Sequence, residues 1–212
     1  MTLKFARYTS LKFPRCDRVK IWNISFLLTT MTVTTYKWSI PEWHDLVDTG
    51  VLEGKPVELL DGEIVEMSPE GIPHTYTNQS VSDYLREILK ALALIRESHP
   101  ITLDNSEPEP DIAVVRLPKT IYKEHHPYPE DIYLLIEVSR STLKLDLQTK
   151  SKIYARNSIP EYWIIDLVNQ KLIVHTQPSD NTYVQIVEYQ SGAITPLAFP
   201  NITIPLDRLL LF

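Results

Sequence analysis

The sequence predicts a mixed α/β fold in which helices flank one β-sheet. The prediction depends on apolar segments over 111–115, 132–138 and 161–166, and on a helical period of apolar residues over 143–157. Segments rich in Val, Ile and Leu are typical of strands buried inside a sheet. The order strand, strand, helix, strand then indicates a sheet with a helical crossover.

A short helix and a hairpin are predicted ahead of this sheet. Ser39 and Glu42 have the spacing of a capping box, which favours a helix over 41–49. Segments 57–60 and 63–67 flank an Asp-Gly pair. Because Asp-Gly between alternating apolar positions is a strong hairpin signal, we predict an N-terminal β-hairpin here.

A long helix and two further strands complete the predicted elements. Helix 74–96 is expected because apolar residues recur at spacings of four and three, at Val81, Leu85, Ile88, Leu92 and Ile95. Segment 118–131, with its prolines and histidines, is expected to be a loop. Segments 171–176 and 183–189 are predicted as strands that form a C-terminal β extension of the sheet.

Composition limits the class of protein. The 212 residues carry a net charge of −6, and residues 1–30 alone contribute +5. We therefore predict a basic segment over 1–30, either a weakly ordered extension or upstream sequence from a misassigned start, and a single acidic domain over 31–212. A single cysteine, Cys16, allows no internal disulfide and fits a reducing cytoplasm. No apolar segment has the roughly 20 residues of a membrane-spanning helix, and no Gly-rich phosphate loop is present among the five glycines.

Two acids stand in strongly apolar surroundings. Asp111 opens one predicted strand, and Glu137 lies inside the next. Strand alternation places Tyr133, Leu135, Glu137 and Ser139 on one face of that strand. If the strands are adjacent, the two carboxylates meet at one end of the sheet and suit a hard cation such as Mg²⁺. The simpler interpretation is that each acid is a solvated strand end or a cap.

Lys150 is predicted to point toward the same place. It shares a helical stripe with Leu143, Leu147 and Tyr154, whose apolar members should face the sheet. An inward lysine beside two carboxylates can stabilise negative charge in a transition state. The alternatives are a lysine that extends to solvent, or one paired with Asp146 four residues earlier.

The ordered set of motifs resembles a known family. It consists of Glu-Leu-Leu-Asp-Gly-Glu-Ile from Glu58, His74, Pro-Asp-Ile-Ala-Val-Val to 115, Leu-Ile-Glu-Val-Ser from 135, the segment from Asp146 to Lys150, and Glu-Tyr-Trp-Ile-Ile-Asp from 161. Over about 36–190 the chain is similar to the Uma-type putative restriction endonuclease family, which has the PD-(D/E)XK nuclease fold. The resemblance implies a restriction-endonuclease-like sheet.

The resemblance also implies roles for individual residues. Asp111 and Glu137 would hold the metal with Glu58 as a third acid, and Lys150 would be the catalytic lysine. In the general motif that lysine stands two residues after the acid, where this chain has Ser139. His74 is expected at the edge of the substrate site, or as a helix-end residue, rather than as a metal ligand.

The leading functional hypothesis is a Mg²⁺-dependent endonuclease acting on DNA, with Mn²⁺ as a substitute and a homodimer as the expected assembly. An acidic body is unfavourable for binding a polyanion, so a local basic surface would be required. The alternative is a protein with a nuclease fold that serves as a DNA-binding or protein-interaction module. A hydrolase that uses Ser139 or Ser141 is disfavoured because neither serine lies in a Gly-x-Ser-x-Gly turn.

Overall fold

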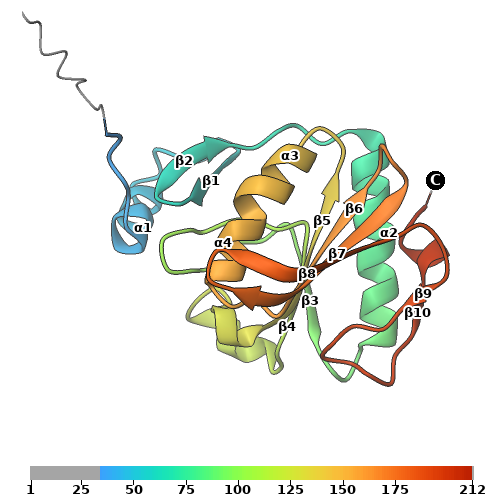
Figure 1. Ribbon diagram of the computed structural model, residues 1–212. Helices are drawn as coiled ribbons and strands as arrows, with labels where there is room; N and C mark the ends of the chain where they lie inside the picture. The colour runs from blue at the N-terminus through green and yellow to red at the C-terminus, as the bar shows by residue number, and fades with distance from the viewer. Residues whose placement is uncertain (1–33, 212) are drawn as a thin grey trace, which may run out of the picture. The chain divides into compact units, whose positions relative to one another are not determined.

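A six-stranded mixed sheet organises residues 34–211, the part of the chain that the computed structural model describes (Figure 1). The strand order is β3-β4-β5-β6-β7-β8, and within this sheet β5 and β6 are parallel while the other neighbours are antiparallel. The strands are β3 (Leu94–Glu97), β4 (Ile112–Val115), β5 (Ile132–Ser139), β6 (Glu161–Asp166), β7 (Lys171–Ser179) and β8 (Thr182–Tyr189). The predicted mixed α/β fold, with its C-terminal β extension, is confirmed. The extension over 1–30 lies outside the described residues.

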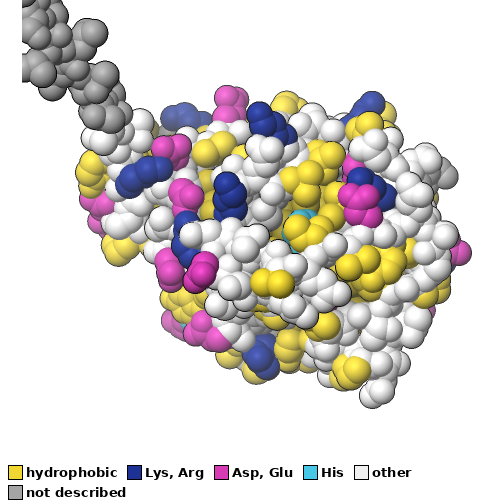
Figure 2. Space-filling view, in the orientation of Figure 1, with side chains coloured by type: hydrophobic (Ala, Val, Ile, Leu, Met, Phe, Trp, Pro, Cys, Tyr) yellow, Lys and Arg dark blue, Asp and Glu magenta, His cyan; other side chains and the backbone are white. Residues whose placement is uncertain are grey.

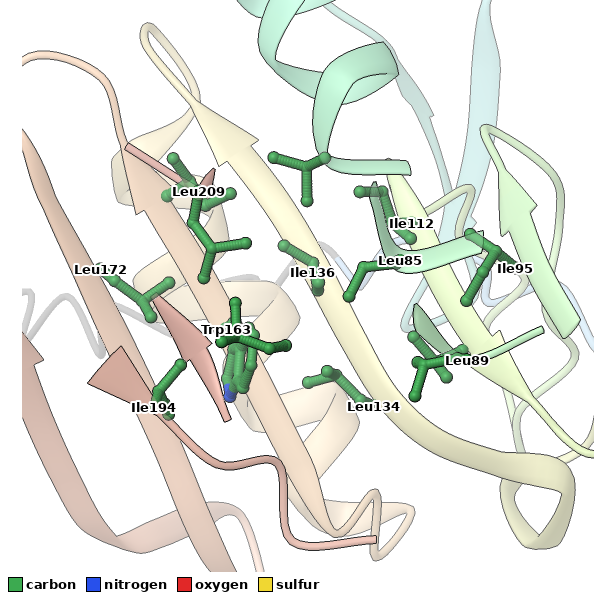
Figure 3. Packing of buried hydrophobic residues seen from close by; sticks show 14 of the residues in the cluster. Leu85, Leu89, Ile95, Ile112, Leu134, Ile136, Trp163, Leu172, Ile194 and Leu209 are labelled. Atoms are coloured by element: carbon green, nitrogen blue, oxygen red, sulfur yellow. The ribbon is translucent and has the colours of Figure 1, made fainter. Parts of the chain in front are cut away.

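Helices cover both faces of the sheet (Figure 1). Helix α2 (Ile72–Ile88) packs on one face through Leu85 and through Leu89 at its C-cap, which contact the layer around Ile136 and Trp163 (Figure 3). The C-terminal segments contribute Ile194 and Leu209 to the same layer. They contain β9 (Ala193–Ile194), β10 (Ile204–Pro205) and the 3₁₀ turn η4 (Leu206–Arg208).

The opposite face is covered by the crossover between β5 and β6. Helix α3 (Leu143–Leu145), the π-turn η3 (Asp146–Lys150) and helix α4 (Ser151–Arg156) form one continuous helical segment. Ile153 and Tyr154 are fully buried there against the sheet. The predicted helix over 143–157 is therefore confirmed, with one wide turn inside it.

The predicted N-terminal elements are confirmed. Helix α1 (Ile40–Asp48) begins at a complete capping box between Ser39 and Glu42. The hairpin of β1 (Val57–Leu60) and β2 (Glu63–Glu66) forms a separate two-stranded sheet. Its Asp-Gly turn has positive φ at both residues, as a tight hairpin turn requires. An isolated bridge between Leu59 and Glu107 ties the hairpin to the rest of the chain.

The predicted helix over 74–96 is confirmed to Ile88 and wrong beyond it. Helix α2 ends at Ile88, and Ile95 lies in β3, paired with Val114 of β4. Leu92, in the intervening turn, is exposed. The spacing of three and four residues continues past Ile88 because Leu92, in the turn, and Ile95, on the edge strand β3, happen to fall at positions that would extend the helical stripe. Long-range pairing with β4 then determined the local structure.

The predicted face of β5 is wrong at one residue. The register shifts between Val114 and Val115, which pair with Leu134 and Ile132 and leave Tyr133 as a bulge. Tyr133 consequently packs on the α2 side, against Phe199. Alternation holds from Leu134 onward.

The segment 118–131 contains two short 3₁₀ turns, η1 (Lys119–Lys123) and η2 (Pro129–Asp131), within the predicted loop. Across residues 34–211, none of the helices combines the length and the apolar character that crossing a membrane requires.

Candidate active site

A cavity of about 380 Å³ gathers all five residues that the sequence analysis singled out: Glu58, His74, Asp111, Glu137 and Lys150. They come from five different parts of the chain. Glu58 lies on β1, His74 in the first turn of α2, Asp111 directly before β4, Glu137 on β5 and Lys150 at the end of the π-turn. Because β4 and β5 are adjacent strands, Asp111 and Glu137 reach the same end of the sheet.

Lys150 occupies the inner part of this cavity. Its Nζ lies 3.0 Å from Glu137 Oε1 and 3.4 Å from Glu58 Oε2, and its side chain is only 7% exposed. Tyr154, one helical turn later, donates its hydroxyl hydrogen to the same Glu137 oxygen at 3.0 Å. The prediction that Lys150 points inward is confirmed. Its partners are Glu137 and Glu58 rather than Asp146.

Asp111 is held from two sides. Its Oδ2 accepts a hydrogen bond from the backbone N–H of Val138 at 2.6 Å and lies 3.1 Å from His74 Nε2. His74 Nδ1 in turn lies 3.6 Å from Glu70 Oε2, in the loop that precedes α2. The backbone of β5 thus fixes the orientation of an acid carried by β4.

The pKa values reflect the burial of these groups. Burial raises the pKa of Glu137 well above its usual value of 4.5, although the Lys150 charge opposes the shift. For Lys150 burial alone would lower the pKa, but the charges of Glu137 and Glu58 outweigh it and raise the pKa. Lys150 therefore stays protonated at neutral pH. Burial also acts to lower the pKa of His74, yet the hydrogen bond and charge of Asp111 raise it overall.

The sequence analysis did not assign Asp146 to the site. Asp146 lines the cavity, is 2% exposed and accepts a hydrogen bond from the Ser139 hydroxyl at 2.5 Å. Burial raises the pKa of Asp146. Ser139, which stands where the nuclease motif has its lysine, is thus occupied in holding this acid. The sequence signal that could have assigned Asp146 to the site is its spacing of four residues from Lys150, which is also the spacing from Lys150 to Tyr154.

The π-turn explains why those three side chains lie together. Positions four apart on a regular α-helix drift by about 40°, so three of them would spread over about 80°. A π-turn rotates the chain by less per residue and counteracts the drift. Asp146, Lys150 and Tyr154 are all buried as a result, whereas Leu143 and Leu147 are only partly buried.

The carboxylates suit a divalent cation. Glu58 uses Oε2, Asp111 uses Oδ2 and Glu137 uses Oε1 for the contacts described above. Within residues 34–211, no hydrogen bond engages the second oxygen of any of these three groups. Hard cations such as Mg²⁺ prefer such oxygen ligands. The acids also outnumber the neighbouring cations, so an added positive charge would be favourable.

A mixed sheet that brings acids of adjacent strands against an inward lysine defines a restriction-endonuclease-like protein. The chain belongs to the Uma2 family, described as a putative restriction endonuclease, whose match covers residues 42–207. Among solved structures it is similar to a putative nuclease of DUF820 from Anabaena variabilis ATCC 29413. That likeness has a TM-score of 0.58 and 14% identity over 73% of this chain and 89% of the other. A comparison with curated proteins gives no significant match.

Proposed function

We propose that this protein is a metal-dependent endonuclease that hydrolyses phosphodiester bonds in DNA, with Mg²⁺ as its cofactor and Mn²⁺ as a substitute. The observation that carries the proposal is the contact of the buried Lys150 ammonium with Glu137, in a cavity that Asp111 also lines. A purely structural role would not require Glu58 and Glu137 to meet a buried lysine in an open cavity that a third acid, Asp111, also lines. The family and the nuclease fold support the same class of reaction.

Asp111, Glu137 and Glu58 would hold the cation through their second oxygens. When bound there, a divalent ion polarises a phosphoryl oxygen and lowers the pKa of a coordinated water. Its charge would also favour the ionised form of Glu137, whose pKa burial otherwise raises.

Lys150 acts in this proposal as a fixed positive charge rather than as a base, because its pKa is raised. A preorganised cation in a site of low dielectric stabilises the charge that develops on the phosphoryl oxygens. Tyr154 acts as a positioning residue, since it restrains Glu137. Glu58, besides holding the cation, also restrains the ammonium.

A basic groove beside the cavity supports DNA as the substrate. The groove, of about 500 Å³, shares Ser98 with the acidic cavity and is also lined by Arg96, His99 and Lys119. Lys119 is exposed, Arg96 is half-buried, and the acid that also lines the groove, Glu97, is paired with Arg86. The face shown in Figure 2 carries acidic and basic side chains interspersed. Phosphates leaving the cavity at Ser98 would therefore meet cations.

Nicking of supercoiled plasmid tests the proposal. We expect cleavage with Mg²⁺ or Mn²⁺, none with EDTA, and a loss of at least about 100-fold in Asp111→Ala, Glu137→Ala and Lys150→Ala, consistent with the removal of electrostatic stabilisation. Lys152→Ala is the matched control, because Lys152 is an exposed lysine on the same helix. Activity that survives all three substitutions would refute the site.

Two further outcomes are informative. Metal-dependent DNA binding without cleavage would support the alternative, a nuclease-fold module that binds DNA. Cleavage of both strands would require two such sites, so a homodimer is expected for that activity, and sedimentation of the active protein measures it.

A further inference from the structure

The outer part of the cavity contains a second set of metal-binding groups. Glu70, His74 and Asp111 each offer one ligand atom, and these atoms all lie within 4.8 Å of one another. The side chains of His74 and Asp111 are 14% and 13% exposed, whereas that of Glu70 is 43% exposed. A semi-buried pair thus lies beside a carboxylate that has room to turn.

The distances fit coordination. Two ligand atoms in adjacent positions of an octahedral ion, each about 2.1 Å from it, lie about 3.0 Å apart. His74 Nε2 and Asp111 Oδ2 are separated by 3.1 Å. Within the described residues, His74 Nδ1 is buried without a hydrogen-bond partner. Among the described residues the ring makes its hydrogen bond to Asp111, and Nδ1 faces Glu70 Oε2 at 3.6 Å, so no closed hydrogen-bond network assigns it a purely structural role.

The chemistry of this set differs from that of the inner acids. Glu58, Glu137 and Asp111 provide only oxygen, which suits Mg²⁺, whereas an imidazole nitrogen favours first-row transition metals. Asp111 belongs to both sets. Cation sites that share a carboxylate in this way hold two ions about 3.5–4 Å apart in many phosphodiesterases.

We propose that Glu70, His74 and Asp111 form a second cation position, which takes Mn²⁺ or a similar transition metal in preference to Mg²⁺ and shares Asp111 with the inner position. The inference extends the proposed nuclease function. It differs from the expectation that His74 is an edge or helix-end residue rather than a ligand. The competing explanation is an ion pair between His74 and Asp111 that only fastens α2 to the sheet.

Mn²⁺ binding to the full chain, measured by electron paramagnetic resonance without DNA, tests the proposal. We expect two bound ions per chain and a nitrogen-14 modulation of the bound-ion echo from the imidazole. His74→Gln should remove that modulation and one of the two ions. Glu137→Gln should retain the modulation, and so should the control His99→Gln, which lines the neighbouring groove.

A wild-type spectrum without nitrogen modulation would overturn the proposal, and this measurement needs no variant to fold. Modulation that persists in His74→Gln would overturn it as well. Failure of the nuclease function is distinguishable. If the chain binds Mn²⁺ through nitrogen but nicks no plasmid, the nuclease function is refuted and the second cation position is retained. If it nicks plasmid without the nitrogen signal, the nuclease function is retained and the second cation position is refuted.

Discussion

Replacing Lys150 with Met should destabilise the protein in a pH-dependent manner. The ammonium lies 3.0 Å from Glu137 and 3.4 Å from Glu58, and all three side chains are buried. Without it, the least costly response is for Glu137 to take up a proton. At pH 7 this costs about 1.36 kcal/mol for each unit above the ordinary pKa of 4.5, or about 3.4 kcal/mol. For a domain of this size the midpoint of thermal unfolding should fall by about 7–14 °C.

The sign of the pH dependence follows from the same group. Burial raises the pKa of Glu137 and the Lys150 charge opposes that rise, so removing the charge raises the pKa further. The variant then binds more protons folded than unfolded, and its stability falls as pH rises above about 4.5. The loss should therefore shrink to about 0.7 kcal/mol at pH 5. Calorimetry of the metal-free protein at pH 5 and pH 7 measures both values.

Two controls make this prediction refutable. Lys152→Met, on the exposed side of the same helix, should change the free energy of unfolding by less than about 0.5 kcal/mol. The double variant Lys150→Met/Glu137→Gln should regain most of the lost stability, since a neutral pair replaces the uncompensated charge. A loss that is equal at both pH values, or that the double variant does not reverse, would refute the reasoning.

Three further outcomes are expected. Burial raises the pKa of Glu161 to about 6, so the wild type should lose about 2 kcal/mol of stability between pH 4 and pH 7, and urea titration of Glu161→Gln should show this slope removed. Ser139→Ala should cost about 1–3 kcal/mol in urea unfolding, because Asp146 loses a buried donor. Arg96→Ala should weaken DNA binding and reduce its salt slope by about 1, whereas Lys171→Ala, in an ion pair on β7, should do neither.

Much of the site could be predicted from sequence because its signals are local. Glu137 is an acid inside an apolar strand, and the helical period of the apolar residues was sufficient to predict that Lys150 points inward. Both conclusions depend on periodicity, which reports the side of an element that a residue occupies. The contact between His74 and Asp111 could not be predicted in the same way, because it joins the start of α2 to the start of β4 and depends on how these elements pack.

The predictions from sequence that were wrong or incomplete also concern features that local periodicity does not report. The end of α2 at Ile88 and the bulge at Tyr133 are both determined by pairing with β4, which a single strand does not encode. Asp146 went unassigned because a regular helix was assumed where the chain has a π-turn.

That π-turn has a consequence for comparisons among relatives. Inserting one residue into an α-helix commonly produces such a turn, and four residues in it rotate the chain by nearly the same angle as three in a regular helix. A relative without the insertion would present the same acid and lysine three positions apart instead of the four that separate Asp146 from Lys150. A motif written with a fixed gap would miss that relative, although its helix offers the same groups to the same strands.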